Sequence, residues 1–535
     1  MAPFNVLAAT VTDIEELLND GTLTSEVVVT EYLKQIDRCN GYLHAVLAVA
    51  PKQLLIERAR FLDQERAAGR VLGPLHGIPL LIKDNIATHP DLGMDTTAGT
   101  LALVGARVPE SAPCVAQKVA SSWGYYPCQG KLECKSAPCR PVCLLMTNAR
   151  KELSNFRGLH MPTGWSAVGG LTQSPYVIGG KRWDDGFGGH SAVGGSSSGS
   201  CAGVAAGFAP AALGTDTNGS ILMPATRHDV YAMKPTLGLI SQDGICPISF
   251  DFDSAGPIAR SARDIAILMD VLVDRTQTTN ISNGTYMSHL TETFDGIRIG
   301  VLEPKEWHMP TVAVTPNTEV DEQQDADVAA AYERLKSLGA IVKPVKVASL
   351  DELVVDGMSQ IQRVMDSRFR HAIESYLSKL EGSKVQTLDE LMQFMRDNAK
   401  QEMPPESPNM TRLEMAAAFN ITADEYQDAL ADMRDFGRRR AVDKCLQDYD
   451  VDIILGPGDS RINELYATAG YPMAVVPLSY ASFNGRPLGL CALSTANQEG
   501  LLIQFMSAWQ SHFNTERQLP TWIGGDPNGV AKSEL

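Results

Sequence analysis

The sequence predicts an α/β fold, in which a single large domain over residues 1–535 holds a central mixed β-sheet flanked by helices. Short apolar runs bounded by Gly, Pro or Asp alternate along the chain with stretches of helical periodicity, and this alternation favours α/β architecture. The composition, with 44% hydrophobic and 20% charged residues, is ordinary for a globular protein. At 535 residues the chain can bury one large core, and no internal repeat divides it.

The first elements are helical. Thr12 and Glu15 have the spacing of a capping box, and residues 13–18 and 25–36 carry apolar residues at helical intervals. A strand is then predicted at 78–82, where a short apolar run lies between Gly77 and Asp84.

In the second half of the chain the same alternation continues. Strands are predicted within 295–304, 340–347, 449–458 and 469–478, and helices over 325–339 and 498–513. Residues from about 350 to 445 differ, because charged helical stretches are interrupted by a Pro-rich break. We expect this segment to be a helical insertion that lines the substrate pocket.

Charge and apolar patterning limit the partners and the location. The formal net charge of −17 would repel phosphate backbones, so a nucleic-acid partner is not expected. The first twenty residues lack the features of a signal peptide and no run of 18 apolar residues occurs, so we expect no membrane span, a cytoplasmic location and reduced cysteines. No motif reports the oligomeric state, and a homodimer is compatible with the sequence.

Two Gly/Ser clusters within residues 194–224 predict a catalytic site. Ser196 and Ser220 lie 24 residues apart, each in a run where glycine lets the backbone approach a ligand. A serine nucleophile needs a base and donors for the oxyanion. Backbone N–H groups of Thr217, Asn218 and Gly219 could supply the donors. Lys83, at the end of the predicted strand at 78–82, is the best-placed base, since burial disfavours a protonated lysine.

Other interpretations of the same residues are weaker. The GSSSG run fits the nucleophile elbow of α/β-hydrolases with Ser197 at its centre and His371 or His512 downstream, but residues 184–193 lack the pattern of the strand which that motif requires. The glycine runs lack the nucleotide-binding patterns. Asp216 is expected to accept hydrogen bonds from nearby backbone N–H groups, and Ser197 and Ser198 are expected to be hydrogen-bonding loop residues.

A set of motifs in a fixed order resembles the amidase signature family of serine hydrolases. The matching segments are HGIPLLIKDNI, NFRG (155–158), GGSSSGS (194–200), GTDTNGSILMPA (214–225), YAMKPTLG (231–238), DSAGPIARS (253–261) and the AGYP turn near the C-terminus. They span nearly the whole chain. The resemblance implies the amidase signature fold and hydrolysis of a carboxamide to a carboxylate and ammonia or an amine, as in enzymes that act on C–N bonds of linear amides. No metal and no organic cofactor are implied.

The resemblance also assigns roles within a Ser-Ser-Lys triad. Ser220 is the acylated nucleophile, Ser196 is the bridging serine and Lys83 is the base. In the family the bridging serine follows a cis peptide bond. The substrate is expected to be a small-molecule amide whose identity the motifs do not specify.

The chain departs from the family pattern in two places. A Cys-rich insertion at about 124–145 holds Cys128, Cys134, Cys139 and Cys143, whose spacing is not that of common zinc sites. It is a lineage-specific loop, a zinc or redox module, or translated intron sequence, and the abrupt change in composition favours the last. The second departure is Leu222, where many relatives carry arginine. Two alternative functions therefore stay open: a catalytically impaired paralogue acting as a binding protein, and a subunit of a glutamine amidotransferase.

Overall fold

The computed structural model describes residues 4–109, 111–112, 144–148, 158–177, 179–278, 281, 284–311, 313–513 and 517–520. The Cys-rich insertion is outside these residues except for its last two positions, and the predictions made for its four cysteines lie outside them as well. So do the first three residues of the NFRG motif. No helix in the described ranges is both long and apolar enough to cross a membrane.

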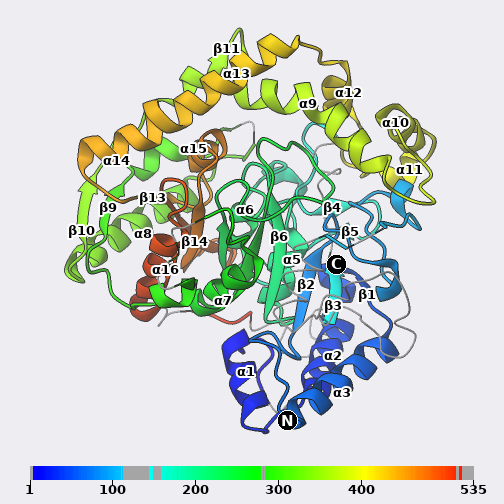
Figure 1. Cartoon of the computed structure of the whole chain (residues 1–535). Coiled ribbons are helices and arrows are strands. Elements are labelled where there is room, and N and C mark those ends of the chain that lie inside the picture. The colour runs from blue at the N-terminus through cyan, green and yellow to red at the C-terminus, as the bar shows by residue number, and fades with distance from the viewer. Residues whose placement is uncertain are drawn as a thin grey trace.

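One sheet of eleven strands forms the centre of the fold (Figure 1). In spatial order its strands are β1 (Val46–Val49), β3 (Leu144–Asn148), β2 (Pro79–Lys83), β6 (Ala211–Asp216), β8 (Ser254–Ala259), β7 (Tyr231–Lys234), β14 (Met473–Tyr480), β15 (Pro487–Leu493), β13 (Ile453–Pro457), β9 (Arg298–Val301) and β10 (Ile341–Pro344). Strand β2 runs parallel to β3 and β6, and β9 runs parallel to β10 and β13, whereas the other pairs are antiparallel. The predicted mixed sheet within a single α/β domain is confirmed. Two short hairpins lie outside the sheet: β4 (Trp165–Ser166) with β5 (Gly170–Leu171), and β11 (Val354–Val355) with β12 (Met358–Ser359).

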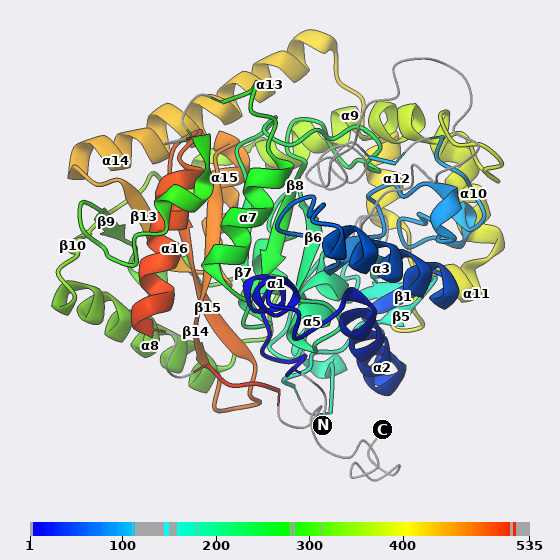
Figure 2. The same cartoon turned by 60° about the horizontal axis from the view of Figure 1, so that its bottom comes forward.

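Helices pack against the strands and at one end of the molecule. Those outside residues 350–450 are α1 (Val11–Asn19), α2 (Ser25–Leu43), α3 (Lys52–Ala67), α5 (Ser198–Ala205), α6 (Leu222–Thr226), α7 (Ala262–Leu272), α8 (Thr318–Ser337), α15 (Ile462–Ala469) and α16 (Glu499–Phe513). Figure 2 shows α7 and α16 side by side, and they contact β8 and β14, respectively. Every residue of α5 is buried, so the segment between the two serine clusters is part of the core.

The first helix begins earlier than the sequence suggested. Thr10 is the N-cap of α1 and forms a capping box with Asp13, so the predicted box of Thr12 and Glu15 was wrong. Both pairs have the required spacing, but tertiary structure decides between them. The Thr12 hydroxyl instead donates to the buried carboxylate of Asp264, 3.1 Å away at the start of α7, which docks the two helices together.

Most other predicted elements occur where they were expected, with shifted ends. The strand predicted at 78–82 is β2, all five of whose residues are buried. The helix predicted over 325–339 is α8, which begins at Thr318 because the side chain of Asn317 caps it.

Residues 350–450 are mostly helical. Helices α9 (Gln360–Leu377), α10 (Leu388–Asp397), α11 (Ala399–Glu402), α12 (Thr411–Ala418), α13 (Ala423–Asp435) and α14 (Asp443–Tyr449) follow one another, with a π-helical turn, η9 (Phe436–Val442), between α13 and α14. In Figure 1 they form an arc across one end of the sheet. This arrangement places α9 and α12 above the ends of the central strands.

Candidate active site

Two neighbouring parallel strands bring the predicted site residues to one edge of the sheet. Lys83 is the last residue of β2, and β6 ends at Asp216, four residues before Ser220. The pairing of Ile82 with Leu213 aligns the carboxyl ends of both strands. In α/β sheets this end of parallel strands is where ligands bind.

Lys83 is buried and contacts the first serine cluster. Its Nζ lies 2.8 Å from the Oγ of Ser196 and 2.9 Å from the carbonyl oxygen of Thr215. The exposed fraction is 0% for Lys83 and 2% for Ser196. The structure therefore joins two of the three predicted triad members directly, in a place that water reaches poorly.

The second serine cluster is tied to the first through the main chain. The N–H of Ser197 donates to the carbonyl oxygen of Ser220 at 2.8 Å, which holds the two runs together. Ser220 is partly exposed, unlike Ser196. The peptide bond between Gly195 and Ser196 is cis, the geometry expected of the bridging serine.

The close approach of the two serine runs requires glycine at position 194. Gly194 has a φ of +70°, and a Cβ on it would lie 3.0 Å from the backbone of Pro224. The two serine runs can therefore pack this closely only with glycine at position 194.

Asp216 organises the turn that carries Ser220. Its carboxylate accepts the N–H groups of Gly219 at 3.0 Å and Leu222 at 3.4 Å, and also that of Ile221. Asp216 is fully buried. Its predicted role as an acceptor for nearby backbone N–H groups is confirmed.

The three residues predicted to bind the oxyanion differ in their surroundings. The hydroxyl of Thr217 donates to Asp253 at 2.6 Å, which fixes the start of the turn. The Gly219 N–H already donates to Asp216 and to the hydroxyl of Tyr466, so it points into the protein rather than toward a ligand. Thr217 and Asn218 remain as the candidates for oxyanion donors.

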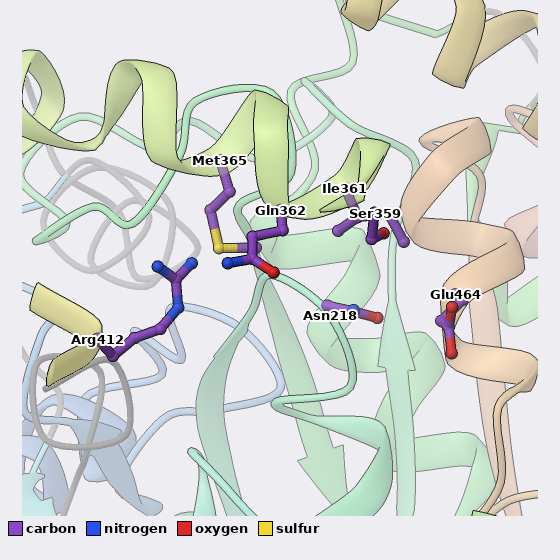
Figure 3. A pocket seen from close by; sticks show the side chains of 7 residues that line it. All are labelled: Asn218, Ser359, Ile361, Gln362, Met365, Arg412 and Glu464. Carbon is purple, nitrogen blue, oxygen red and sulfur yellow. The ribbon is translucent and has the colours of Figure 1, made fainter. Parts of the chain in front are cut away.

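A cavity of about 360 Å³ lies above this turn (Figure 3). In Figure 3, Asn218 lies at its floor, with Arg412 and Glu464 on opposite sides. Five of its seven lining residues have polar or charged side chains, and the lining residues are Asn218, Ser359, Ile361, Gln362, Met365, Arg412 and Glu464. Because four of these belong to β12 and α9 and one to α12, the helical segment predicted at 350–445 contributes most of the wall.

Both charged side chains of the wall are paired within the protein. Arg412 binds the buried Asp366, with Nη1 at 2.8 Å from one carboxylate oxygen and Nη2 on the other. Burial raises the pKa of Asp366, and the guanidinium opposes that shift. Glu464 accepts from Arg461 at 3.0 Å. The cavity thus carries no uncompensated charge from these two residues.

Several residues of the site were not found from the sequence. Tyr466, Arg412 and Gln362 lie in the last third of the chain, far from the serine clusters in sequence, and belong to no motif of the resemblance. Only their helical periodicity was visible, and it does not tell which residues face a cavity. No sequence signal could have identified them.

The structure gives no support to the nucleophile-elbow interpretation. Ser197 donates to the carbonyl oxygen of Thr215 at 3.1 Å, and the described residues 184–193 form no strand. Ser198 donates to the carbonyl oxygen of Gly194 at 2.6 Å. Ser197 and Ser198 form hydrogen bonds, as predicted, but only Ser197 lies outside a helix, because Ser198 is the first residue of α5. Among the described side chains, no group of three or more His, Cys, Asp and Glu residues is placed to hold a metal ion.

Comparisons with known proteins identify the family. The family model described as Amidase matches residues 27–120 and 187–460. A protein of Arabidopsis thaliana named as a probable amidase is 30% identical over 523 residues, which cover 95% of this chain and 90% of the relative. A glutamyl-tRNA(Gln) amidotransferase subunit from Staphylococcus haemolyticus is 28% identical, with 94% and 96% of the two chains covered.

A solved structure shares the fold over nearly the full length. The native peptide amidase of Stenotrophomonas maltophilia superposes with a TM-score of 0.80 at 28% identity, covering 96% of this chain and 98% of its own. Lys83 lies in the first segment that the family model matches, and both serine clusters lie in the second. The chain belongs to the Amidase family.

Proposed function

We propose that the protein hydrolyses a carboxamide through an acyl-enzyme on Ser220, with Ser196 and Lys83 as its proton relay. The observation that carries the proposal is the buried hydrogen bond between Lys83 and Ser196, in a loop tied to Ser220 by the bond from Ser197 N–H. A buried lysine can serve as a base when it is neutral.

The proposed reaction forms and then hydrolyses an ester between the acyl group and Ser220. Ser220 Oγ attacks the carboxamide carbon and gives its proton to Ser196 Oγ, which passes its own proton to the neutral amine of Lys83. Backbone N–H groups of Thr217 and Asn218 stabilise the oxyanion. The relay then runs in reverse and protonates the leaving ammonia or amine as the C–N bond breaks. Water attacks the acyl-enzyme by the same route and releases the carboxylate.

The cavity next to Asn218 is the proposed site for the acyl group. A volume of about 360 Å³ is at the small end of ligand pockets, which span roughly 300–1,000 Å³. Ile361 and Met365 offer apolar contact, whereas Gln362 and Ser359 offer hydrogen bonds. We therefore expect a compact acyl group with polar substituents, in preference to a long fatty chain.

Labelling with a fluorophosphonate probe tests the nucleophile. The wild type is expected to be labelled on the peptide containing Ser220, because a phosphonate traps an activated serine. Ser220→Ala should not be labelled, and Ser482→Ala, which changes an exposed serine, should be labelled as fast as the wild type. Equal labelling of Ser220→Ala and wild type would refute the nucleophile assignment, and no labelling of the wild type would support a catalytically impaired paralogue.

A substrate panel tests the pocket. Primary amides, anilides, fatty-acid amides and peptide amides are incubated with the enzyme, and the carboxylate product is measured by mass spectrometry. Faster turnover of short polar acyl groups is the expected result. Preference for long-chain fatty-acid amides would show that the cavity at Asn218 does not hold the acyl group.

A further inference from the structure

A buried tyrosine lies directly behind the turn that carries Ser220. Tyr466 comes from α15 and is fully buried, and its hydroxyl donates to the Asp216 carboxylate and accepts the N–H of Gly219. Burial, together with the negative charge of Asp216, raises the pKa of Tyr466 well above its usual range. The hydroxyl therefore keeps its proton and remains a donor to Asp216.

The ring of Tyr466 is held as firmly as its hydroxyl. The side-chain nitrogen of Lys234, a residue that is 1% exposed, lies 5.4 Å from the ring centroid and donates to the carbonyl oxygen of Tyr471 at 3.1 Å. Burial lowers the pKa of Lys234 to about 7, and in its protonated form this group attracts the aromatic face. Tyr466 thus connects the end of β7, a fixed part of the sheet, to the turn that carries Ser220.

The backbone conformation at Gly219 is restricted by its contacts with Asp216 and Tyr466. Its φ is +93°, and a Cβ on it would lie 2.9 Å from the sulfur of Met223. Hydrogen bonds from its N–H to Asp216 and Tyr466 set the orientation of the peptide plane between Asn218 and Gly219, one residue before Ser220. Rotation of that plane would change the ψ of Asn218 and the φ of Gly219, and the changed dihedrals would alter the position of Ser220 relative to the oxyanion donors that precede it.

We propose that Tyr466 is a positioning residue, whose hydroxyl holds the Asp216–Gly219 turn in the orientation that presents Ser220 and the oxyanion donors. This inference rests on the proposed function of Ser220. A misplacement of about 1 Å at a reacting group can cost on the order of 100-fold in rate. The substrate cavity is built mainly from α9 and α12, so loss of the Tyr466 hydroxyl affects the reaction step more than binding.

Tyr466→Phe tests the proposal, because it keeps the ring over Lys234 and removes only the hydroxyl. We expect kcat and the fluorophosphonate labelling rate to fall about 10- to 100-fold, with KM close to the wild-type value. Tyr231→Phe is the matched control. Tyr231 is also fully buried in the sheet, and its hydroxyl has no hydrogen-bond partner among the described residues. That variant should keep wild-type kcat and labelling rate.

Asp216→Asn and the double variant separate positioning from a general loss of packing. If Tyr466 acts through Asp216, the two substitutions are not additive, and Tyr466→Phe slows the Asp216→Asn enzyme less than it slows the wild type. A Tyr466→Phe enzyme with wild-type kcat would overturn the inference, as would equal losses in Tyr231→Phe or full additivity. Labelling of Ser220→Ala would instead refute the proposed nucleophile, so the two failures are distinguishable. Should Tyr466→Phe not fold, the kcat of Asp216→Asn alone decides, and an unchanged value would overturn the inference.

Discussion

Neighbouring serines of the first cluster have different environments although they look equivalent in the sequence. Ser196 contacts Lys83, whereas Ser197 donates to Thr215 O and accepts from Thr215 N at 3.3 Å. Ser200 donates to the carbonyl oxygen of Leu213. The Ser196 hydroxyl thus contacts the proposed base, whereas the hydroxyls of Ser197 and Ser200 bind backbone groups of β6.

This difference gives a prediction for Ser196 and Ser197. Ser196→Ala removes the proposed proton relay, and we expect kcat to fall about 10²- to 10⁴-fold, well beyond any effect of its stability loss. Ser197→Ala removes the two buried hydrogen bonds that the Ser197 hydroxyl makes with the N–H and the carbonyl oxygen of Thr215, and it should lower the free energy of unfolding by about 1–3 kcal/mol while kcat stays near the wild-type value. Steady-state kinetics and urea unfolding of both variants measure the two effects. A larger kcat loss in Ser197→Ala than in Ser196→Ala would contradict the assigned roles.

At the scale of elements, the helices above the sheet depend on close backbone contact. Gly437, in the π-helical turn η9, packs against the end of α15, which carries Tyr466. A Cβ at Gly437 would lie 2.5 Å from Ala469 N and 2.6 Å from Thr468 C. Because these are backbone atoms, they cannot move aside as a side chain would.

We therefore expect Gly437→Ala to lower the free energy of unfolding by about 1–3 kcal/mol, the usual cost of overpacking. Gly41→Ala is the control, since Gly41 lies within helix α2 and a Cβ there meets nothing within 4 Å. That change should raise the free energy of unfolding by about 0.5–1 kcal/mol through helix propensity. Urea unfolding of the two variants compares them, and a Gly437→Ala protein as stable as Gly41→Ala would contradict the packing argument.

The sequence predicted element types well and their environments less well. Short apolar runs identified β2, β13 and β14, and the predicted triad residues Lys83 and Ser196 are in contact. The capping of α1 was misassigned because the Thr12 hydroxyl binds Asp264, more than 250 residues away, while Thr10 caps the helix. Tyr466 and Arg412 were missed for the same reason, since long-range packing selects which helical residues face the site.

For the whole molecule, buried polar groups join segments that are distant in the sequence. Asp459, which follows β13, binds Arg227 at the end of α6 and Arg486 before β15. Both guanidinium groups are 1% exposed. Burial, as the largest cause, and these two arginines hold the pKa of the neighbouring His190 down to about 4. The network is thus arranged around a neutral imidazole.

His228 is a second buried imidazole, and it gives a prediction on acid stability. Burial lowers its pKa to about 4, although its Nδ1 lies 2.7 Å from the carbonyl oxygen of Pro224. In the unfolded chain a histidine has a pKa of about 6.5. Between pH 6.5 and 4 the unfolded state therefore binds one more proton at this position than the folded state, so the folded protein loses stability as the pH falls through that window.

Comparing variants isolates the effect of this proton from that of other titrating groups. One of these is Asp264, whose pKa burial raises to about 6, so that its protonation favours the folded state as the pH falls. The difference in free energy of unfolding between wild type and His228→Gln should change by up to about 1.4 kcal/mol per pH unit between pH 6.5 and 4, with the wild type losing more stability. His371→Gln, which alters an exposed histidine, should show no such slope against the wild type. Urea unfolding at half-unit pH steps measures both differences. Parallel pH profiles for wild type and His228→Gln would mean that His228 titrates alike in the folded and unfolded states, and that its burial does not exclude the proton.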